Sequence, residues 1–472
     1  MDRAEAEAVY DAGREAVVEV LLAMDRRIAL LEARVEQLER QLRRDSRNSS
    51  SPPSSDPPGV SRSRQRREQG SERRQGAQPG HEGHGRELLP TEAVDEVVEY
   101  WPERCACGHA FDEGERAEGV LVARHQVEEL PQLATRVTEH QLHRVRCPDC
   151  GREQRGELAV GVARSAFGPR LQAAVAVLAV RNRVSRRDTV ELCEELFGAR
   201  ISTGSVDSIL ARTGDALAEP YEQLLDSARR SKHLNMDETG WRLHGQQRTL
   251  WGAFSKRHAI FKITNSRHAD HAKALLEGHR GIVTSDRWWA YNQLPLARRQ
   301  ICWAHLRRDF KAHAEGLPIE REFAEHGLRI TDQLFWAWEI YQHTHDRREL
   351  QRRIRLLRRE LKPILRQYCG KAPRYKYCRG LARNLLKVWP ALWTFAERPG
   401  VEPTNNHAER SLRGAVIYRK LSLGSQSEAG EHRIERLLSA SITCRLQQRS
   451  LFAYLAELLA AHAPGDPAPT LA

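Results

Sequence analysis

Residues 46–87 divide this chain of 472 residues into parts that must fold separately. The segment is rich in serine, proline, glycine and arginine and has almost no large apolar side chain, so it cannot form a core. We expect a disordered linker there. Its arginines either contact phosphates without sequence preference or stay solvated, and the sequence leaves both readings open.

The segment before this linker, residues 1–45, has the pattern of a coiled-coil helix. Apolar side chains recur at spacings that alternate between four and three, at Val17, Leu21, Met24, Ile28, Leu31, Val35, Leu38 and Leu42. A stripe sustained in this way favours pairing with a second copy, so we expect a homo-oligomer. An amphipathic helix packed on its own domain is the alternative.

Charge and hydropathy restrict the partners of the chain. Lysine and arginine number 75 against 63 acidic residues, and the resulting charge of +12 favours nucleic acid or an anionic membrane surface. The most apolar run, residues 171–180, is about half the length that spans a bilayer, and the N-terminus does not resemble a secretion signal. We expect a cytoplasmic, nucleoid-associated protein without a membrane partner, whose nine cysteines are thiols or metal ligands. A basic protein without a polyanionic partner is the alternative.

Residues 88–160 combine alternating apolar segments of strand type, such as residues 119–130, with two cysteine pairs. The pairs are Cys105 with Cys107 and Cys147 with Cys150, each beside a glycine-containing turn. Four thiolates in two pairs suit a tetrahedral structural Zn²⁺ site in a small β module, with His109 as a substitute ligand. The C-x-C spacing of the first pair is uncommon, so a degenerate knuckle with free thiols is the alternative.

Residues 165–218 have the pattern of three helices. Ser185 caps the second helix and Gly198 ends it, and the third opens at Ser202 or Thr203. A short helix, a glycine-containing turn and a further helix describe a helix-turn-helix, whose last helix enters the major groove of DNA. A trihelical bundle without DNA is the alternative.

Residues 230–445 change from short apolar runs to helices. The strand-type runs between 230 and 310, of which the last is RRQICWAHLRRDF, enclose the helical segment HADHAKALLEGH, as an α/β nucleotidyl-transfer core requires. A basic helical insertion follows at about 313–400, and residues 446–472 add a C-terminal helix and a fraying tail. We therefore expect a multidomain α+β protein.

Three carboxylates stand apart in this region. Asp237 ends the apolar run LNMD, Asp286 ends GIVTSD, and Glu409 lies in a helix opened by Thr404 or Asn405. Adjacent strands would bring the two aspartates together, where their charges repel unless a cation binds between them. Two Mg²⁺ (or Mn²⁺) ions held in this way clamp the attacking and leaving oxygens of a phosphoryl transfer. Turn capping is the alternative role for such aspartates. Rival carboxylates are Asp270, Glu238 and Glu402.

Four segments resemble the insertion-sequence 66 family of bacterial transposases, namely MDETGWRLHG, TSDRWWAYNQL, ICWAHLRRDF and TNNHAERSLRGAVIYRKLSLGSQSEAG. The linker motifs SSSPPSSDPP and GAQPGHEGHG also match, so the resemblance covers nearly the whole chain in the expected order. It implies a zinc-binding module, a helix-turn-helix and an RNase H-like catalytic domain with a helical insertion before the final acid. Asp237, Asp286 and Glu409 match the Asp–Asp–Glu (DDE) triad of the family, whereas the C-x-C pair departs from its usual spacing.

The resemblance also draws attention to residues near the triad. Expected DNA contacts are Arg410, Arg413, Arg419, Lys420, His305 and Trp288. His305 would alternatively support a metal ligand or serve structure alone. Trp241, Trp288 and Trp289 would either stack on a splayed base or belong to the core.

The activity that the resemblance implies is metal-dependent cleavage at the ends of an insertion sequence. The freed 3′-hydroxyl then attacks target DNA without a covalent protein intermediate. Accessory proteins of the same element are further expected partners. A catalytically inactive DNA-binding protein and a metal-dependent nuclease that joins no strands are the two alternatives.

Overall fold

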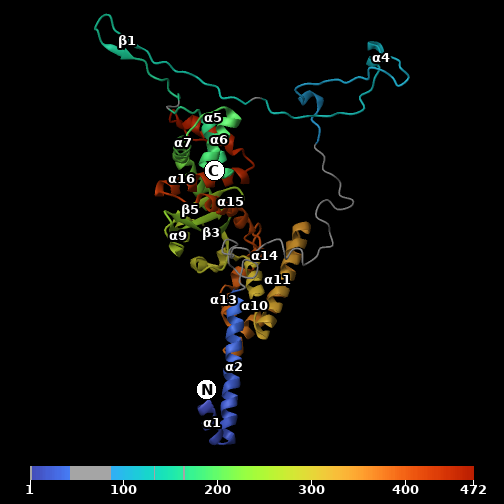
Figure 1. Cartoon of the computed structure of the whole chain (residues 1–472), viewed down its shortest axis with the longest axis vertical. Coiled ribbons are helices and arrows are strands. Elements are labelled where there is room, and N and C mark those ends of the chain that lie inside the picture. Colours follow the sequence, from blue (N-terminus) through green and yellow to red (C-terminus); the bar gives the residue numbers. More distant parts are fainter. Residues whose placement is uncertain (1–2, 43–86, 132, 163–164) are drawn as a thin grey trace. The chain divides into compact units, whose positions relative to one another are not determined.

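The computed structural model describes residues 3–42, 87–131, 133–162 and 165–472 (Figure 1). The chain divides into two compact units, residues 58–135 and residues 1–57 with 136–472. Every helix in the described ranges is too short or too polar to cross a bilayer.

Two helices form the N-terminal segment, α1 (Arg3–Asp11) and α2 (Arg14–Leu42). They meet at Gly13, whose φ of 100° lies in the region that glycine adopts at little cost. Five stripe side chains are between 42% and 59% exposed, namely Leu21, Met24, Ile28, Leu31 and Val35. The predicted helix is confirmed, and pairing through its stripe stays a prediction. The side chains of Leu38 and Leu42 and the linker up to residue 86 lie outside the described set.

Residues 88–160 have less β structure than their alternating pattern predicted. In the described part of this segment the elements are η2 (Thr91–Ala93), α4 (Glu113–Ala117), β1 (Arg144–Arg146) and β2 (Glu153–Arg155). The strand predicted at 119–130 is absent there, and Val120 and Val122 are 82% and 94% exposed. Alternation of apolar and polar residues forms a strand only where a neighbouring strand supplies hydrogen bonds. Residues 119–130 have no such neighbouring strand among the described residues. The segment also falls into both compact units rather than one.

A helical group precedes the sheet and confirms the three predicted helices. Its members are α5 (Pro169–Ala176), its π-helical continuation η3 (Val177–Arg181), α6 (Arg186–Phe197), α7 (Thr203–Ala216) and α8 (Ala218–Arg229). The hydroxyl of Ser185 accepts the Asp188 amide at 3.1 Å and so caps α6. Gly198 ends α6 in the left-handed region, at a φ of 63°. Ser202 caps α7 as Ser185 caps α6.

A five-stranded mixed sheet follows, in the order β5-β4-β3-β6-β7. Its strands are β3 (His233–Leu243), β4 (Gln246–Phe254), β5 (Ala259–Thr264), β6 (Ile282–Ser285) and β7 (Arg299–Ile301). The first three form an antiparallel meander, and β6 and β7 run parallel to β3. The connections after β5 are α9 (Ala269–Leu275), η4 (Trp289–Gln293) and η5 (Leu296–Arg298). The two-residue turn at His244 and Gly245 has positive φ at both positions, which matches the twist of a hairpin.

The free edge of β5 is closed by side chains of α16 (Glu428–Leu446). Alternate backbone amides of β5 donate to helix side chains four residues apart. The pairs are Ala259 with Thr443 (2.9 Å), Phe261 with Ser439 (2.9 Å) and Ile263 with Glu435 (2.6 Å). A covered edge presents no unpaired donors to other chains.

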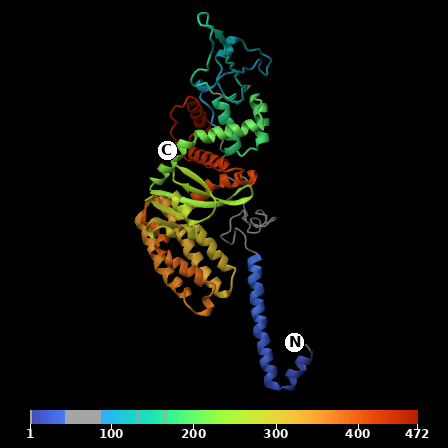
Figure 2. The same cartoon turned by 90° about the vertical axis from the view of Figure 1, so that its left-hand side faces the viewer.

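Helices between β7 and the last part of the chain form a bundle with its own core. Its elements are α10 (Trp303–Ala314), α11 (Pro318–Thr344), α12 (Arg347–Tyr368), η6 (Pro373–Tyr375), α13 (Arg379–Lys387), η7 (Trp389–Leu392) and α14 (Thr394–Glu397). The helical insertion predicted at about 313–400 is confirmed, although CWAHLRRDF, read as strand, forms α10. Figure 2 shows this bundle in yellow to orange beside the sheet, with α15 (Asn406–Ser422) and α16 in red against the sheet. The chain ends with α17 (Leu451–His462).

Candidate active site

The three carboxylates come from β3, the end of β6 and the first turn of α15. In the parallel pair of β3 with β6, Asn235 is the partner of Thr284, so Asp237 and Asp286 each lie two residues beyond that pair. The predicted neighbouring strands are therefore confirmed. Asp237 was expected at a strand end, but β3 continues to Leu243 because its later residues pair with β4.

Burial and neighbouring acids disfavour the ionised forms of Asp237 and Asp286. Burial raises the pKa of Asp237 well above its ordinary value, and the charges of Glu238, Asp286 and Glu409 raise it further. Burial, with the charge of Glu238, raises the pKa of Asp286 to about 6. Crowded, partly desolvated carboxylates favour protonation unless a cation offsets their charge.

A buried amide connects the strand of Asp237 to the helix of Glu409. The Asn405 side chain donates to the Met236 carbonyl at 2.7 Å and accepts from the Asn235 side chain at 3.0 Å. Asn405 is fully buried and directly precedes α15. Because Met236 adjoins Asp237, these bonds fix the first acid relative to the third.

The backbone of Asn405 also bonds to the residue that follows β7. The backbone N–H of Asn405 donates to the Cys302 thiol at 3.1 Å, and the Trp303 amide donates to the Pro403 carbonyl at 2.9 Å. The two chain ends of the helical insertion are therefore joined beside the carboxylates. Sequence reasoning missed Asn235 and Cys302 and considered Asn405 only as a helix start. The one available signal was a polar amide inside the apolar run LNMD.

Asp286 is held by a buried guanidinium and a local turn. Its side chain accepts the Trp288 amide at 2.9 Å, and Arg299 donates to its backbone carbonyl at 2.9 Å. Arg299 is fully buried, and this burial lowers its pKa to about 10, so it stays charged at neutral pH. Sequence reasoning also missed Arg299, because nothing in its local pattern distinguishes it from the exposed arginines.

Glu409 is held from the side of α10. Arg308 donates to the Glu409 carboxylate at 3.3 Å and to Nε2 of His305 at 2.9 Å. A guanidinium only donates, so Nε2 must accept and the proton of neutral His305 lies on Nδ1. Nδ1 is 3.7 Å from Glu409 and has no other partner among the described residues. Burial, with Arg308 and Arg287, lowers the pKa of His305 to about 3 and keeps it neutral.

Cys302, His305 and Glu409 together have the spacing of a metal site, with ligand atoms within 4.8 Å of one another. Their chemistry does not favour Mg²⁺ or Mn²⁺. Burial raises the pKa of Cys302 to about 12, so its thiol is protonated in the metal-free state, and sulfur is a soft ligand for these hard cations. His305 presents its N–H rather than its lone pair to Glu409. The cluster is therefore better suited to orienting Glu409 than to holding an ion.

The rival carboxylates have other partners or lie at the surface. Glu238 is buried, with its carboxylate bonded to the Arg267 guanidinium and, at 2.5 Å, to the Tyr291 hydroxyl. Asp270 is 79% exposed and pairs with His268. Glu402 is exposed.

The tryptophans near the acids differ in exposure. Trp241 is a core residue, stacked on Tyr418, so the base-stacking interpretation is wrong for it. Arg267 lies 3.9 Å over the ring of Trp288 and occupies one of its faces. Trp289 is 49% exposed and is the accessible ring of the three.

The cations of α15 also fall into two groups. Arg419 is tied down, because it donates to the Gly240 carbonyl and to the Thr239 hydroxyl. The exposed cations, which follow one another at helical spacing, are Arg410, Arg413 and Lys420.

Both cysteine pairs lie in tight turns of their own. The Gly108 amide donates to the Cys105 carbonyl at 2.9 Å, and the Gly151 amide donates to the Cys147 carbonyl at the same distance. Hydrogen bonds from the His109 backbone and the Cys105 thiol lower the pKa of Cys107. Backbone amides at 149 and 150 do the same for Cys147. Lowered thiol pKa values favour metal binding, whereas the His109 ring is bonded to Glu115 at 2.9 Å.

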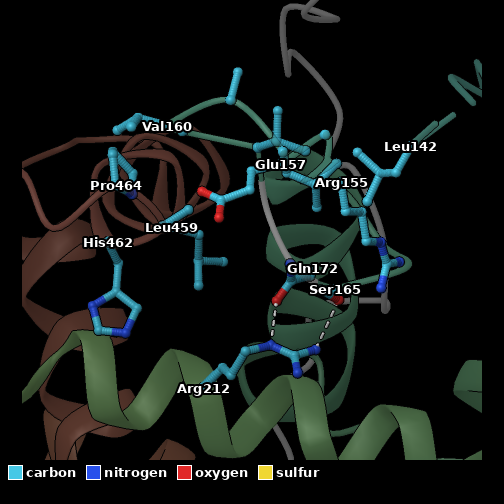
Figure 3. Close-up of a pocket in the computed structure, with 16 residues that line it drawn as sticks. Leu142, Arg155, Glu157, Val160, Ser165, Gln172, Arg212, Leu459, His462 and Pro464 are labelled. Carbon is cyan, nitrogen blue, oxygen red and sulfur yellow. Dashed lines mark hydrogen bonds between the residues drawn. The ribbon is translucent and has the colours of Figure 1, made fainter. Parts of the chain in front are cut away.

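A pocket of about 920 Å³ lies elsewhere in the fold, beside α5, α7 and α17 (Figure 3). The Arg212 side chain of α7 extends to Gln172 and Ser165, with both distances at 3.1 Å. The exposed polar side chains of α7 are Thr203, Asp207, Ser208 and Asp215, so this helix presents no free cation to solvent. DNA binding by the predicted helix-turn-helix stays a prediction.

Comparison with known proteins finds two family models and two relatives that match parts of the chain. The model described as a family of unknown function (DUF6444) matches residues 2–87. Two uncharacterized proteins of Sinorhizobium fredii, y4hP and y4qI, are each 27% identical over 43% and 46% of this chain. The chain matches about two-fifths of the length of these relatives, 40% and 42%. The model of the transposase IS66 family matches residues 164–433, more than half of the chain and all three carboxylates, and the chain therefore belongs to the IS66 family of transposases.

Proposed function

We propose that the chain is a DDE transposase that cleaves DNA at the ends of an insertion sequence and joins the freed 3′-ends to target DNA. The observation that carries this proposal is the convergence of Asp237, Asp286 and Glu409 from two adjacent strands and one helix. The strand order, with a helical insertion before Glu409, supports an RNase H-like core.

The donor set fits divalent cations. The three side chains offer hard carboxylate oxygens, and the raised pKa values of Asp237 and Asp286 indicate unbalanced negative charge that a cation would offset. Two Mg²⁺ or Mn²⁺ ions held by Asp237, Asp286 and Glu409 would activate the attacking oxygen and stabilise the leaving oxygen. The Cys302 and His305 side chains remain outside this ligand set, because sulfur is a soft ligand and the lone pair of His305 accepts from Arg308.

The chain contributes positioning to two in-line displacements. In the first, water attacks a phosphodiester at the end of the element, the P–O3′ bond breaks and a 3′-hydroxyl is freed. In the second, that hydroxyl attacks a phosphodiester of the target, a new P–O3′ bond forms and the target 3′-oxygen leaves. Asn405, Arg299 and Arg308 hold the carboxylates in place, and Arg410, Arg413 and Lys420 bind phosphates beside them.

The remaining parts of the chain serve DNA recognition and assembly in this proposal. The cysteine turns hold a structural Zn²⁺, residues 165–218 recognise the ends of the element, and Trp289 stacks on a splayed base. The exposed stripe of α2 pairs with a second copy in a homo-oligomer. Accessory proteins of the same element complete the assembly.

The test is transposition of a marked mini-element in cells that also supply the other genes of the element. Wild type is compared with D237N, D286N and E409Q, which keep side-chain size and remove charge. We expect each variant to abolish transposition while protein level and end binding persist.

Three results would contradict the proposal in different ways. A single variant that transposes like wild type removes that acid from the triad. End binding by wild type without metal-dependent cleavage indicates a catalytically inactive DNA-binding protein. Cleaved products without joined strands, in a purified system with Mg²⁺ or Mn²⁺, indicate a nuclease.

A further inference from the structure

The outer face of α12 carries an uninterrupted row of cations. They follow one another at spacings of four, three, four, three and four, at Arg348, Arg352, Arg355, Arg359, Lys362 and Arg366. At 100° per residue these positions fall within an arc of roughly 80°, and they extend over about 27 Å. We call them the basic seam. The opposite face is buried in the insertion core, through Leu350, Ile354, Leu357, Leu361 and Leu365.

Arginines of the same helix that lie off the seam are engaged with the protein. Arg347 donates to the Ala396 carbonyl at 3.1 Å, and Arg358 pairs with Glu397 at 2.9 Å. Arg353 pairs with Glu349 at 2.6 Å and lies over the Trp336 ring. These side chains stabilise the insertion.

The seam cations are mostly without such partners. Arg352 pairs with Glu349, and Lys362 lies near the Trp389 ring. Arg348, Arg355, Arg359 and Arg366 are exposed and make no ion pair or hydrogen bond within the described residues. Both acids of α12, Glu349 and Glu360, lie off the seam arc. A face of one sign that the fold does not use is the arrangement expected of a polyanion-binding surface.

We propose that the basic seam is a second DNA-contact surface, which binds the phosphate backbone of a duplex without reading its sequence. The seam length corresponds to roughly eight base pairs at 3.4 Å per step. Its members are long, flexible cations with no apolar anchor between them, which suits phosphates rather than base edges or an acidic protein interface. The inference rests on the proposed function only in that DNA is the substrate, because the seam itself includes none of the carboxylates.

The test is salt-dependent binding of the purified full chain to a 40-base-pair duplex of arbitrary sequence, measured by fluorescence anisotropy. The seam variant is R348Q/R355Q/R359Q/R366Q. A charge-keeping control is R348K/R355K/R359K/R366K. A second control, R3Q/R14Q/R26Q/R27Q in α1 and α2, removes the same net charge from exposed positions elsewhere. Circular dichroism and thermal unfolding verify that each variant folds.

We expect the seam variant to bind at least about tenfold more weakly at 0.1 M salt. The slope of log K against log salt should become shallower by about 3 to 4, near 0.9 for each lost phosphate contact. The lysine control should keep both the affinity and the slope, because a point charge suffices for phosphate. The α1 and α2 control should keep the slope.

Two outcomes would overturn the proposal. An unchanged slope in the folded seam variant means that the seam does not contact DNA, and an equal loss in the second control means that only net charge matters. Neither outcome bears on the catalytic proposal, because the assay measures binding and not cleavage. If D237N loses strand joining but keeps the wild-type slope of log K against log salt, the catalytic proposal and the seam proposal stand independently of each other.

Discussion

The carboxylate site and the basic seam lie in the same compact unit but are built in opposite ways. The backbone beside Asp237 and at Asp286 is held by buried hydrogen bonds of Asn405 and Arg299, with distances of 2.7 to 3.0 Å. The Glu409 carboxylate is held by Arg308 at 3.3 Å. Five of the six seam cations are exposed, and four of them make no ion pair or hydrogen bond within the described residues. The first arrangement fixes atoms relative to one another, and the second only places charge along a line.

This difference predicts how each region tolerates substitution. A site that depends on distances should fail when one group changes, because its members act as a unit. A surface that depends on charge should lose affinity in proportion to the charges removed and should accept lysine for arginine.

The largest effect should come from Asp237 compared with its neighbour Glu238. We expect D237N to lower strand joining by at least about a thousandfold, because it removes one carboxylate of the metal site. E238Q should instead keep joining and change stability by at most about 1 kcal/mol, because the Arg267 left without its charged partner is 46% exposed to water. Joining assays and denaturant unfolding of both variants measure the two effects. If E238Q fails in joining as completely as D237N, Glu238 also belongs to the catalytic site.

The pH dependence of stability should reveal the crowded carboxylates in metal-free protein. The pKa of Asp286 is raised from 3.8 to about 6, so its ionised form is disfavoured in the folded state. The free-energy cost of ionising Asp286 in the folded state is absent below pH 4. It grows as pH rises between 4 and 6, and it is complete above pH 6. Relative to D286N, wild type should therefore lose about 2 to 3 kcal/mol of unfolding free energy between pH 4 and pH 7. Denaturant unfolding in chelator measures this, and a difference that is flat with pH would show that Asp286 is not crowded.

The next largest effect should come from the buried side-chain amide of Asn405. N405A removes two side-chain bonds and should lower joining by about 10- to 100-fold, with an increased Mg²⁺ concentration for half-maximal rate. C302S keeps an acceptor for the backbone N–H of Asn405 and serves as the matched control. Its joining rate should stay within about threefold of wild type. An N405A variant that is destabilised but has the metal dependence of wild type would assign Asn405 to folding alone.

The smallest effect should come from one seam residue. R355Q should weaken duplex binding by only a few-fold and reduce the salt slope by about 1, and R355K should match wild type. The anisotropy assay described above measures both. A single substitution that abolished binding would show that the seam is a precise site, and the contrast with the carboxylates would then fail.

Sequence patterns predicted well those parts of the fold that depend on local chemistry. Ser185 and Gly198 marked the ends of α6, and the apolar runs before Asp237 and Asp286 marked β3 and β6. The same kind of signal failed at 119–130, because strand pairing depends on a partner that alternation does not specify.

The residues that hold the site in place could not be predicted from the sequence. Asn235 and Asn405 are separated by 170 residues and form one hydrogen bond. Their pairing depends on how β3, β7 and α15 meet, which no local pattern encodes. The resemblance identified the three acids, but it did not indicate that His305 carries its proton on Nδ1 or that Trp241 is buried.

The closed edge of β5 depends on two repeat lengths that nearly coincide. Four residues of helix rise about 6 Å and two residues of strand rise about 6.6 Å, so Glu435, Ser439 and Thr443 keep step with alternate amides of β5. A shift of α16 by one residue would move all three acceptors away together. The helix and strand are therefore in register or out of it, and one residue inserted or deleted within α16 would break the phase between its acceptors and the β5 amides.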